Sequence, residues 1–159
     1  MFKRINNALK QIVHRWLFTY QFDVQTDGYE LNKKYDGDAG YDLRLTEDCK
    51  LMPRQIIDAN TNVKIKSNGV KAWIRLIGRS STLIKYNLIV DEGIIDDGYT
   101  GELLIKIYNP TNKKIVLKKG TRIGQFIIQP LTWGEFKSVE EFVVKEGERG
   151  EKGFGHTGV

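Results

Sequence analysis

The chain has 159 residues, of which 40% are hydrophobic and 28% are charged, a size and balance typical of one globular domain with its own core. The net charge of +5 is modest, and no dense block of Lys and Arg indicates a nucleic-acid-binding arm. The single cysteine, Cys49, excludes an internal disulfide, and no apolar run approaches the roughly 18 residues of a spanning helix. We therefore expect a reducing, cytoplasmic location, with no nucleic-acid or membrane partner.

The first residues of the chain, 1–17, differ in pattern from the rest. Apolar side chains recur there at helical spacing, at Phe2, Ile5, Leu9, Ile12, Val13 and Trp16. Basic residues stand mostly between them, so the pattern predicts a short amphipathic helix that precedes the main domain. This helix could pack on the domain or on a neighbouring subunit, remain frayed, or touch a membrane surface, and the sequence leaves these alternatives open.

Short alternating runs of β-branched and aromatic residues follow from residue 18 onward. They predict strands at 18–24, 63–66, 73–77, 103–108, 115–117 and 125–128, separated by turn signals such as Asn68-Gly69. Ile94-Ile95, with Asp97-Gly98 shortly after, predicts a further strand that runs into a tight turn. Residues 79–88 could hold one helical turn or a short helix. The many short strands predict an all-β sandwich or jelly roll over residues 18–148, with no internal domain boundary.

The last stretch of the chain, residues 149–159, is rich in glycine. Glycines at positions 150, 153, 155 and 158 disfavour regular structure and let backbone N–H groups converge. With Arg149 and Lys152 beside them, such N–H groups suit a polyphosphate, and Phe154 could lie flat on a ring-shaped ligand. A disordered tail is the alternative, and both hold if a flexible tail orders over a ligand as a lid.

Four further motifs precede this tail, and the order of all five carries a resemblance. They are Ala39-Gly40-Tyr41-Asp42-Leu43, Gly78-Arg79-Ser80-Ser81, Gly93-Ile94-Ile95-Asp96-Asp97-Gly98-Tyr99-Thr100-Gly101 and Gly120-Thr121-Arg122-Ile123-Gly124-Gln125. With the tail they resemble the motifs of the trimeric dUTPases, which hydrolyse dUTP to dUMP and pyrophosphate. The resemblance covers roughly residues 18–158. It implies a jelly-roll β-sandwich of the dUTPase type, dUTP as substrate, Mg²⁺ as cofactor, and a homotrimer whose active sites are shared between subunits.

Asp96 is the candidate catalytic residue. A carboxylate at the junction of a strand and a tight turn can hold a water in line with a phosphoanhydride and take its proton. An isolated Asp beside Asp-Gly is usually a turn former, but the resemblance places the water-activating Asp here. It also implies that the hairpin holds uracil through its backbone, around Ile94, Ile95 and Leu104, with Tyr99 beneath the deoxyribose.

Candidate phosphate-binding residues come from the second motif, the fourth motif and the tail. Arg79 supplies a planar fork of charged donors, and Ser80 and Ser81 add hydroxyls, although Arg-Ser-Ser alone often caps a helix. The resemblance implies that Gln125 hydrogen-bonds phosphate or its water, where an exposed strand residue is the alternative. It further implies substrate contacts from Arg149, Phe154, Gly155, His156 and Thr157.

The resemblance implies an indirect metal role for Asp42. In this family Mg²⁺ is held mainly by the triphosphate, and protein carboxylates reach it through water, in keeping with its preference for oxygen ligands and a partial hydration shell. Support of the third-motif hairpin is the alternative role for Asp42.

The chain departs from the family pattern at several positions. His156 stands where the tail motif usually has serine, and its imidazole can still donate to phosphate. Gly78 replaces the usual proline before Arg79, which would loosen that turn, and the segment between the second and third motifs is slightly shorter than in many relatives.

Two alternative functions stay open at this point. dCTP deaminases share the fold and a similar Arg-Ser-Ser motif, but they need a carboxylate where this chain has Lys106, and Ile84 stands where they have an arginine. A nucleotide-binding regulatory protein of the same fold would bind dUTP without turnover, although the retained Asp96 and the complete tail favour an enzyme.

Overall fold

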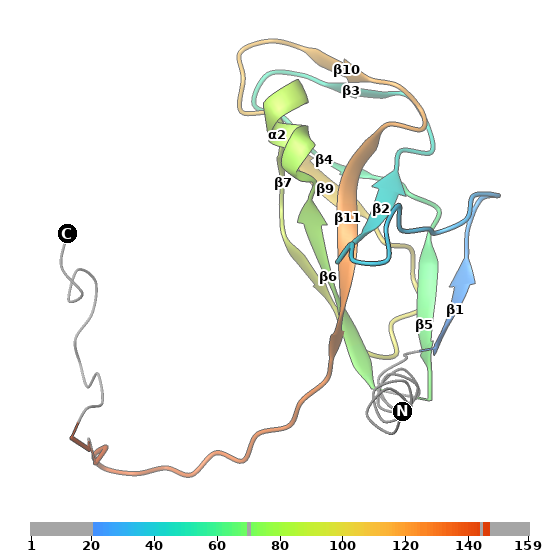
Figure 1. Ribbon diagram of the computed structural model, residues 1–159. Helices are drawn as coiled ribbons and strands as arrows, with labels where there is room; N and C mark the ends of the chain where they lie inside the picture. The colour runs from blue at the N-terminus through green and yellow to red at the C-terminus, as the bar shows by residue number, and fades with distance from the viewer. Residues whose placement is uncertain (1–20, 70, 144, 147–159) are drawn as a thin grey trace, which may run out of the picture.

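The computed structural model describes residues 21–69, 71–143 and 145–146 of the chain (Figure 1). In this part, eleven short strands and one short helix make up the regular structure. The prediction of an all-β fold is therefore confirmed. The predicted helix at 1–17 and the predicted tail at 149–159 lie outside the described residues.

The largest sheet has four antiparallel strands in the order β2-β11-β6-β8. These strands are β2 (Tyr41–Arg44), β6 (Ala72–Gly78), β8 (Gly93–Ile95) and β11 (Arg122–Pro130). In β6 the side chains of Ala72, Ile74 and Leu76 are buried while Arg75 is exposed. This two-residue period places the apolar face of the sheet against the core.

A second sheet, β4-β9-β7, lies behind the first and closes the sandwich (Figure 1). Its strands are β4 (Ile56–Ala59), β7 (Ile89–Val90) and β9 (Ile105–Tyr108). Two antiparallel pairs extend the sandwich: β1 (Gln21–Gln25) with β5 (Lys64–Asn68), and β3 (Cys49–Leu51) with β10 (Ile115–Leu117). Ile107 of one sheet and Phe126 of the other are almost fully buried in the common core.

The one described helix, α2 (Ser80–Tyr86), follows β6 directly and confirms the short helix expected within 79–88. It ends at Asn87, whose left-handed backbone (φ 51°) lets its N–H donate to the carbonyl of Leu83 at 2.9 Å. Asn tolerates this conformation better than most residues, so the helix stops after two turns. No helix in the described ranges is long and apolar enough to cross a membrane.

The strand predictions are confirmed in position for β1, β5, β6, β8, β9, β10 and β11, with end points that differ by a few residues. Four strands were not predicted: β2, β3, β4 and β7. They are two to four residues long, too short for an alternating pattern to stand out.

Candidate active site

A cleft of about 630 Å³ opens where β2, α2 and the first residues of β11 meet. Four predicted site residues line it: Asp42, Arg79, Ser80 and Gln125. The other lining residues are Asn32, Lys33, Lys34, Tyr35, Asp38, Ala39, Gly40, Arg44, Arg122 and Ile127. The strand register explains the meeting, because Gln125 of β11 pairs with Asp42 of β2 on one side and with Ile77 of β6 on the other.

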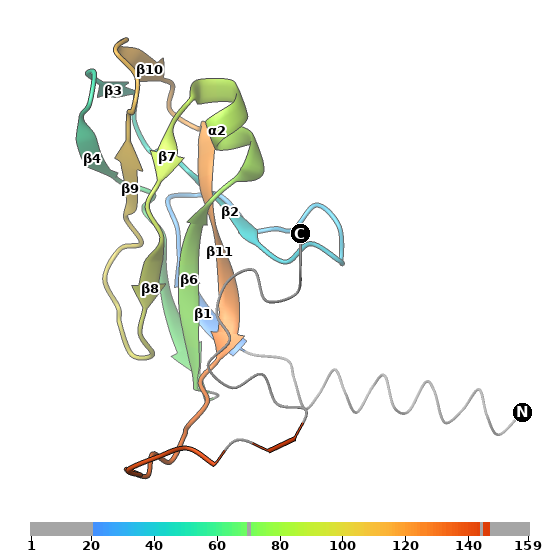
Figure 2. The same ribbon diagram turned by 90° about the vertical axis from the view of Figure 1, so that its left-hand side faces the viewer.

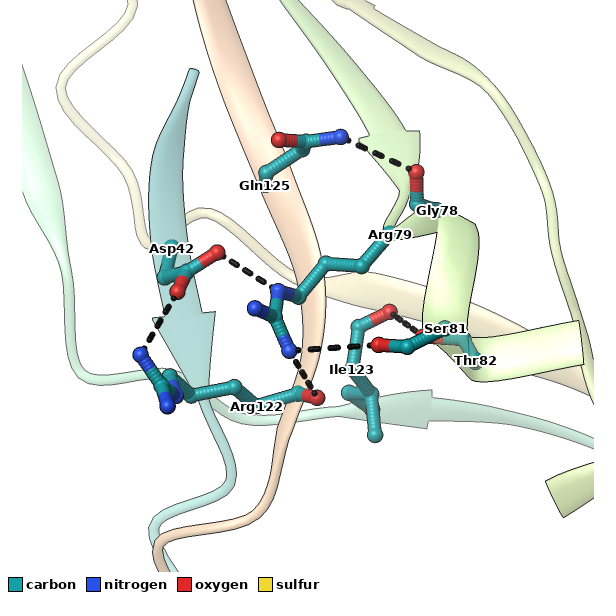
Figure 3. Close-up of polar contacts among 8 residues, drawn as sticks. All are labelled: Asp42, Gly78, Arg79, Ser81, Thr82, Arg122, Ile123 and Gln125. Atoms are coloured by element: carbon teal, nitrogen blue, oxygen red, sulfur yellow. Dashed lines mark hydrogen bonds and ion pairs between the residues drawn. The ribbon is translucent and has the colours of Figure 1, made fainter. Parts of the chain in front are cut away.

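Asp42 binds two arginines in this cleft (Figure 3). Its Oδ1 accepts a hydrogen bond from Arg79 Nε at 2.6 Å, and its Oδ2 accepts one from Arg122 Nη1 at 3.0 Å. The Asp42 and Arg79 side chains are only 26% and 27% exposed, so this contact is sheltered from solvent. Charge-assisted pairs of this kind fix the plane and direction of a guanidinium.

Arg122 lines the cleft and binds Asp42, but the sequence reasoning gave it no role. It belongs to the fourth motif, but only the glutamine of that motif received a role. Lys33 and Lys34 were also missed, because they lie in a loop before the first motif. The signal in the sequence that could have identified these two lysines is their positive charge close to the first motif, which contains a single carboxylate.

Arg79 is held at several points, and part of its guanidinium stays open to the cleft. Its Nη1 donates to Ser81 Oγ and to the backbone carbonyl of Arg122, both at 3.4 Å, and none of the other residues drawn in Figure 3 contacts its Nη2. Ser80, the first residue of α2, is exposed on the cleft wall, whereas Ser81 reaches the site through Arg79.

Gln125 lies under the cleft floor with its amide fixed. Its Nε2 donates to the carbonyl of Gly78 at 3.3 Å, and a Cβ at Gly40 would lie 2.6 Å from its Oε1. A side chain at position 40 would therefore displace the Gln125 amide. The lack of a proline at position 78 was expected to loosen the turn before Arg79. Gly78 ends β6 and pairs with Gly124, so strand pairing holds this position.

The strand-to-turn junction after β8 carries the predicted catalytic residue. Asp96 follows β8 directly, and its carbonyl accepts a hydrogen bond from the Tyr99 N–H at 3.2 Å across a turn in which Gly98 has a φ of 90°. The Asp96 side chain is exposed, and no carboxylate contact joins it to any residue that the structure describes. It is therefore open to bind a water. Tyr99 is 45% exposed and donates its hydroxyl to the carbonyl of Glu102 at 3.2 Å.

A second hollow, of about 380 Å³, lies beside this hairpin and takes in Ile95 and Leu104. Gln125 lines both this hollow and the cleft. Ile94 does not line it; its side chain is 65% exposed, and the residue pairs with Arg75. Of the three residues expected around uracil, the structure thus brings two to one hollow.

Helix α2, whose first residue lines the cleft, and the turn after β8 lie at opposite ends of β6 within one chain (Figure 2). Ile95 pairs with Ile74, so Asp96 lies beside the start of β6, whereas Arg79 follows its end. At about 3.3 Å per residue, the six-residue separation along this strand amounts to about 20 Å. Asp42 lies with Arg79 and therefore far from the hairpin. The tail residues Arg149, Phe154, Gly155, His156 and Thr157 lie outside the described residues.

The described residues contain no group of three or more His, Cys, Asp or Glu side chains that could hold a metal ion. Two carboxylates, Asp38 and Asp42, line the cleft, and both oxygens of Asp42 are engaged by arginines. This donor set fits a cation that brings its other ligands with it, such as phosphate oxygens and water, and does not build a complete coordination shell.

Comparison with known proteins places this site in a family. The family model described as dUTPase matches residues 27–158. A deoxyuridine 5'-triphosphate nucleotidohydrolase of Acinetobacter baylyi is 35% identical over 126 residues, which cover 77% of this chain and 83% of that protein. A protein of the same name from Paramecium bursaria Chlorella virus 1 is also 35% identical, over 78% of this chain and 86% of its own.

Solved structures agree with these matches. The dUTPase of Staphylococcus bacteriophage 80alpha, determined with dUPNHPP, is 30% identical and has a TM-score of 0.75, over 89% of this chain and 99% of that one. A bacteriophage phi11 dUTPase variant, described with a structural Mg(II) ion, shares the fold at 24% identity and a TM-score of 0.68, over 78% and 98% of the two chains. The resemblance inferred from the five motifs is confirmed: the chain belongs to the dUTPase family.

Proposed function

We propose that this protein is a dUTP diphosphatase, which hydrolyses dUTP to dUMP and pyrophosphate. The observation that carries the proposal is the cleft in which Arg79 and Ser80 meet Gln125 from a distant part of the sequence, with Arg79 and Arg122 both held by Asp42. The relatives named deoxyuridine 5'-triphosphate nucleotidohydrolase support the same activity. They give no support to the deaminase or to a purely regulatory role.

The cleft binds the triphosphate in this proposal. The open edge of Arg79 and the hydroxyl of Ser80 donate to phosphate oxygens, and Gln125 donates to a phosphate or to its bound water. Ser81, Asp42 and the other arginine keep Arg79 in place. Because Arg79 and Gln125 are held in place before the substrate arrives, little reorganisation is needed as charge moves onto the leaving group.

Asp96 acts as the general base. Its carboxylate takes a proton from a water whose oxygen attacks phosphorus, a new P–O bond forms, and the anhydride bond between the α- and β-phosphates breaks. Pyrophosphate leaves with the bonding electrons, and the proton stays on Asp96 until it is released to solvent. The hairpin around Ile94, Ile95 and Leu104 holds uracil, and Tyr99 lies against the deoxyribose.

The separation of the two halves of this machinery supports a shared site. An Asp side chain cannot cross the distance of about 20 Å between the turn and the cleft within one chain. A neighbouring copy that brings its hairpin to this cleft removes the difficulty. We therefore propose a homotrimer in which one subunit supplies Asp96 and another supplies Arg79 to each site.

The segment after β11 supports the same arrangement. Residues 131–143 run away from the sandwich in an extended path (Figure 1), and Trp133, Phe136 and Phe142 are 78%, 99% and 88% exposed. Such large apolar side chains gain stability when a partner covers them. We propose that this segment crosses a neighbouring subunit and delivers the tail, with Arg149, Phe154, Gly155, His156 and Thr157, to a site on another chain.

Mg²⁺ fits this site as a partner of the triphosphate. We propose that Asp42, whose oxygens already bind two arginines, contacts the ion through water. When bound, the ion would neutralise part of the phosphate charge. Removal of the metal by a chelator should then lower the affinity of the protein for the triphosphate. A cytoplasmic location also remains a proposal, based on the single buried cysteine.

Pyrophosphate release from a panel of dUTP, UTP, dTTP and dCTP tests the function. The proposal expects release from dUTP with Mg²⁺ and far less from the other three nucleotides. Binding of dUTP without release would contradict it in favour of a regulator, and ammonia release from dCTP would contradict it in favour of a deaminase.

A further inference from the structure

The residue after Asp96 is fixed in a way that the proposed chemistry does not use. Asp97 accepts a hydrogen bond from Ser67 Oγ on one carboxylate oxygen and binds Lys71 Nζ at 2.9 Å on the other. Its side chain is only 12% exposed, whereas the lysine side chain is 65% exposed. Asp97 thus turns inward, away from the solvent that its neighbour faces.

These three residues come from three separate segments. Ser67 lies in β5, Lys71 lies directly before β6, and Asp97 lies in the turn after β8. The turn therefore gains a link to the β1-β5 pair, to which β8 itself is not hydrogen-bonded. Tyr99 contacts Asp96 and Glu102 within the hairpin. Farther along the hairpin, Glu102 and Leu103 bind residues 61–63, so the contact of Asp97 is the link nearest to Asp96.

The chemistry of the contact favours a lasting link. Hydrogen bonds from Ser67 and from Lys71 hold the pKa of the Asp97 carboxyl below its usual value, with a smaller contribution from the backbone N–H of Ala72. The carboxylate is therefore ionised at neutral pH, and charge-assisted hydrogen bonds of this kind are stronger than neutral ones.

We propose that Ser67, Lys71 and Asp97 form a clamp that positions Asp96 for catalysis, a role that rests on the proposed function of Asp96 as the general base. Asp96 lies on a turn that needs the left-handed Gly98, and a turn of this kind has little stiffness of its own. Displacement of a reacting group by about 1 Å can cost about 100-fold in rate. The clamp residues are positioning residues, since they touch Asp97 and not the substrate.

The test compares four clamp variants with one matched control. Ser67→Ala and Lys71→Met each remove one contact, and Ser67→Thr and Lys71→Arg keep the hydroxyl and the charge. Asp48→Asn is the control, because Asp48 also binds a lysine, Lys118 Nζ at 2.7 Å, and a backbone N–H, that of Lys119 at 2.9 Å, away from the hairpin. The measurements are kcat and KM for dUTP with Mg²⁺, the thermal unfolding temperature, and amide hydrogen exchange at Tyr99.

The clamp predicts that Ser67→Ala and Lys71→Met lower kcat about tenfold or more, with a smaller rise in KM, and speed exchange at the Tyr99 amide. Ser67→Thr and Lys71→Arg should recover most of the loss. Asp48→Asn should leave kcat and the Tyr99 exchange unchanged, even where it lowers the unfolding temperature.

Three results would overturn the proposal. The first is a wild-type kcat in both Ser67→Ala and Lys71→Met, and the second is a Tyr99 exchange rate that these two variants leave unchanged. The third is a loss of kcat that Asp48→Asn shows as well, in proportion to its fall in unfolding temperature. The exchange measurement needs no turnover, so it judges the clamp even if the wild-type protein fails to release pyrophosphate. That failure would instead count against the proposed function.

Discussion

Two arginines share one carboxylate at the floor of the cleft, and this fixes what each can do. Asp42 uses one oxygen for Arg79 and the other for Arg122, which sets the orientation of both guanidiniums. The geometry depends on the planar fork of arginine, since the point charge of lysine cannot hold Asp42 and present further donors in a fixed plane.

Arg79→Lys should therefore weaken binding of the triphosphate although the charge is kept. The expected result is a rise of about tenfold or more in the Kd for a non-hydrolysable dUTP analogue, measured by calorimetry, as expected when a bidentate site loses its geometry. Arg75→Lys is the matched control: Arg75 lies on β6, the strand that precedes Arg79, and binds Glu92 with two nitrogens, but it does not line the cleft. Equal affinity in the two variants would count against the phosphate role.

A second substitution tests the proposed role of the exposed Asp96 carboxylate as the general base. Asp96→Asn keeps the size of the side chain but cannot take a proton, so kcat should fall by about 10²- to 10⁴-fold, the usual cost of losing a general base. The fold and the affinity for the analogue should remain, which thermal unfolding and calorimetry check. More than about a tenth of the wild-type rate in this variant would show that another group accepts the proton.

At the scale of elements, the sequence predicts the long strands well. β6 alternates clearly, and its apolar positions, such as Leu76, enter the core as the two-residue period requires. β11 also buries Phe126, although its register against β2 shifts between Arg122 and Gly124. β3 and β4 are too short to show that period, and their pairing with β10 and β9 depends on contacts far along the chain. Such pairing is a tertiary effect that local pattern does not carry.

The candidate site likewise contains residues that the sequence predicted and contacts that it could not predict. The motif match identified Arg79, Ser80 and Gln125, which the cleft brings together. It could not identify the contact of Arg122 with Asp42, because the two residues are 80 positions apart and only the β2-β11 register makes them neighbours. The distance between Asp96 and the cleft could not be predicted from the sequence either, because it depends on where β8 pairs along β6.

The tail is the element whose removal should separate binding from turnover. A chain truncated before Arg149 keeps the cleft and the hairpin, so it should still bind deoxyuridine monophosphate, while dUTP turnover falls sharply. In the full chain, Phe154→Trp should change its fluorescence when the non-hydrolysable analogue and Mg²⁺ are added, because closure changes the surroundings of the ring. An unchanged signal at saturating analogue would contradict the lid.

At the scale of the whole molecule, the proposed active site belongs to an assembly. In the proposed trimer, the hairpin and the cleft of one chain serve different sites, and the exposed segment 131–143 extends away from the sandwich of its own chain. In a closed ring of three copies, each chain then serves three sites with different parts.

Mixing two inactive variants tests this assembly. Asp96→Asn and the chain truncated before Arg149 are unfolded together and refolded at equal amounts. If the catalytic carboxylate and the tail come from different subunits, random assortment restores about a quarter of the wild-type sites, as cyclic symmetry requires. Each variant refolded alone is the control. A trimeric mixture without dUTP turnover would mean that both parts come from one chain.

The side chains around the cleft also govern how fast a ligand arrives. Five of them are cationic and two are carboxylates, which leaves an excess of three positive charges on one side of the molecule before any ligand binds. Such a field draws in a polyanion from beyond contact distance, and it is screened over about 10 Å at 0.1 M salt. The association rate constant of a triphosphate should thus fall steeply as ionic strength rises, while the dissociation rate constant changes little. Stopped-flow measurements over a series of NaCl concentrations would reveal this. Uncharged deoxyuridine is the control ligand, and its association rate constant should not change with ionic strength.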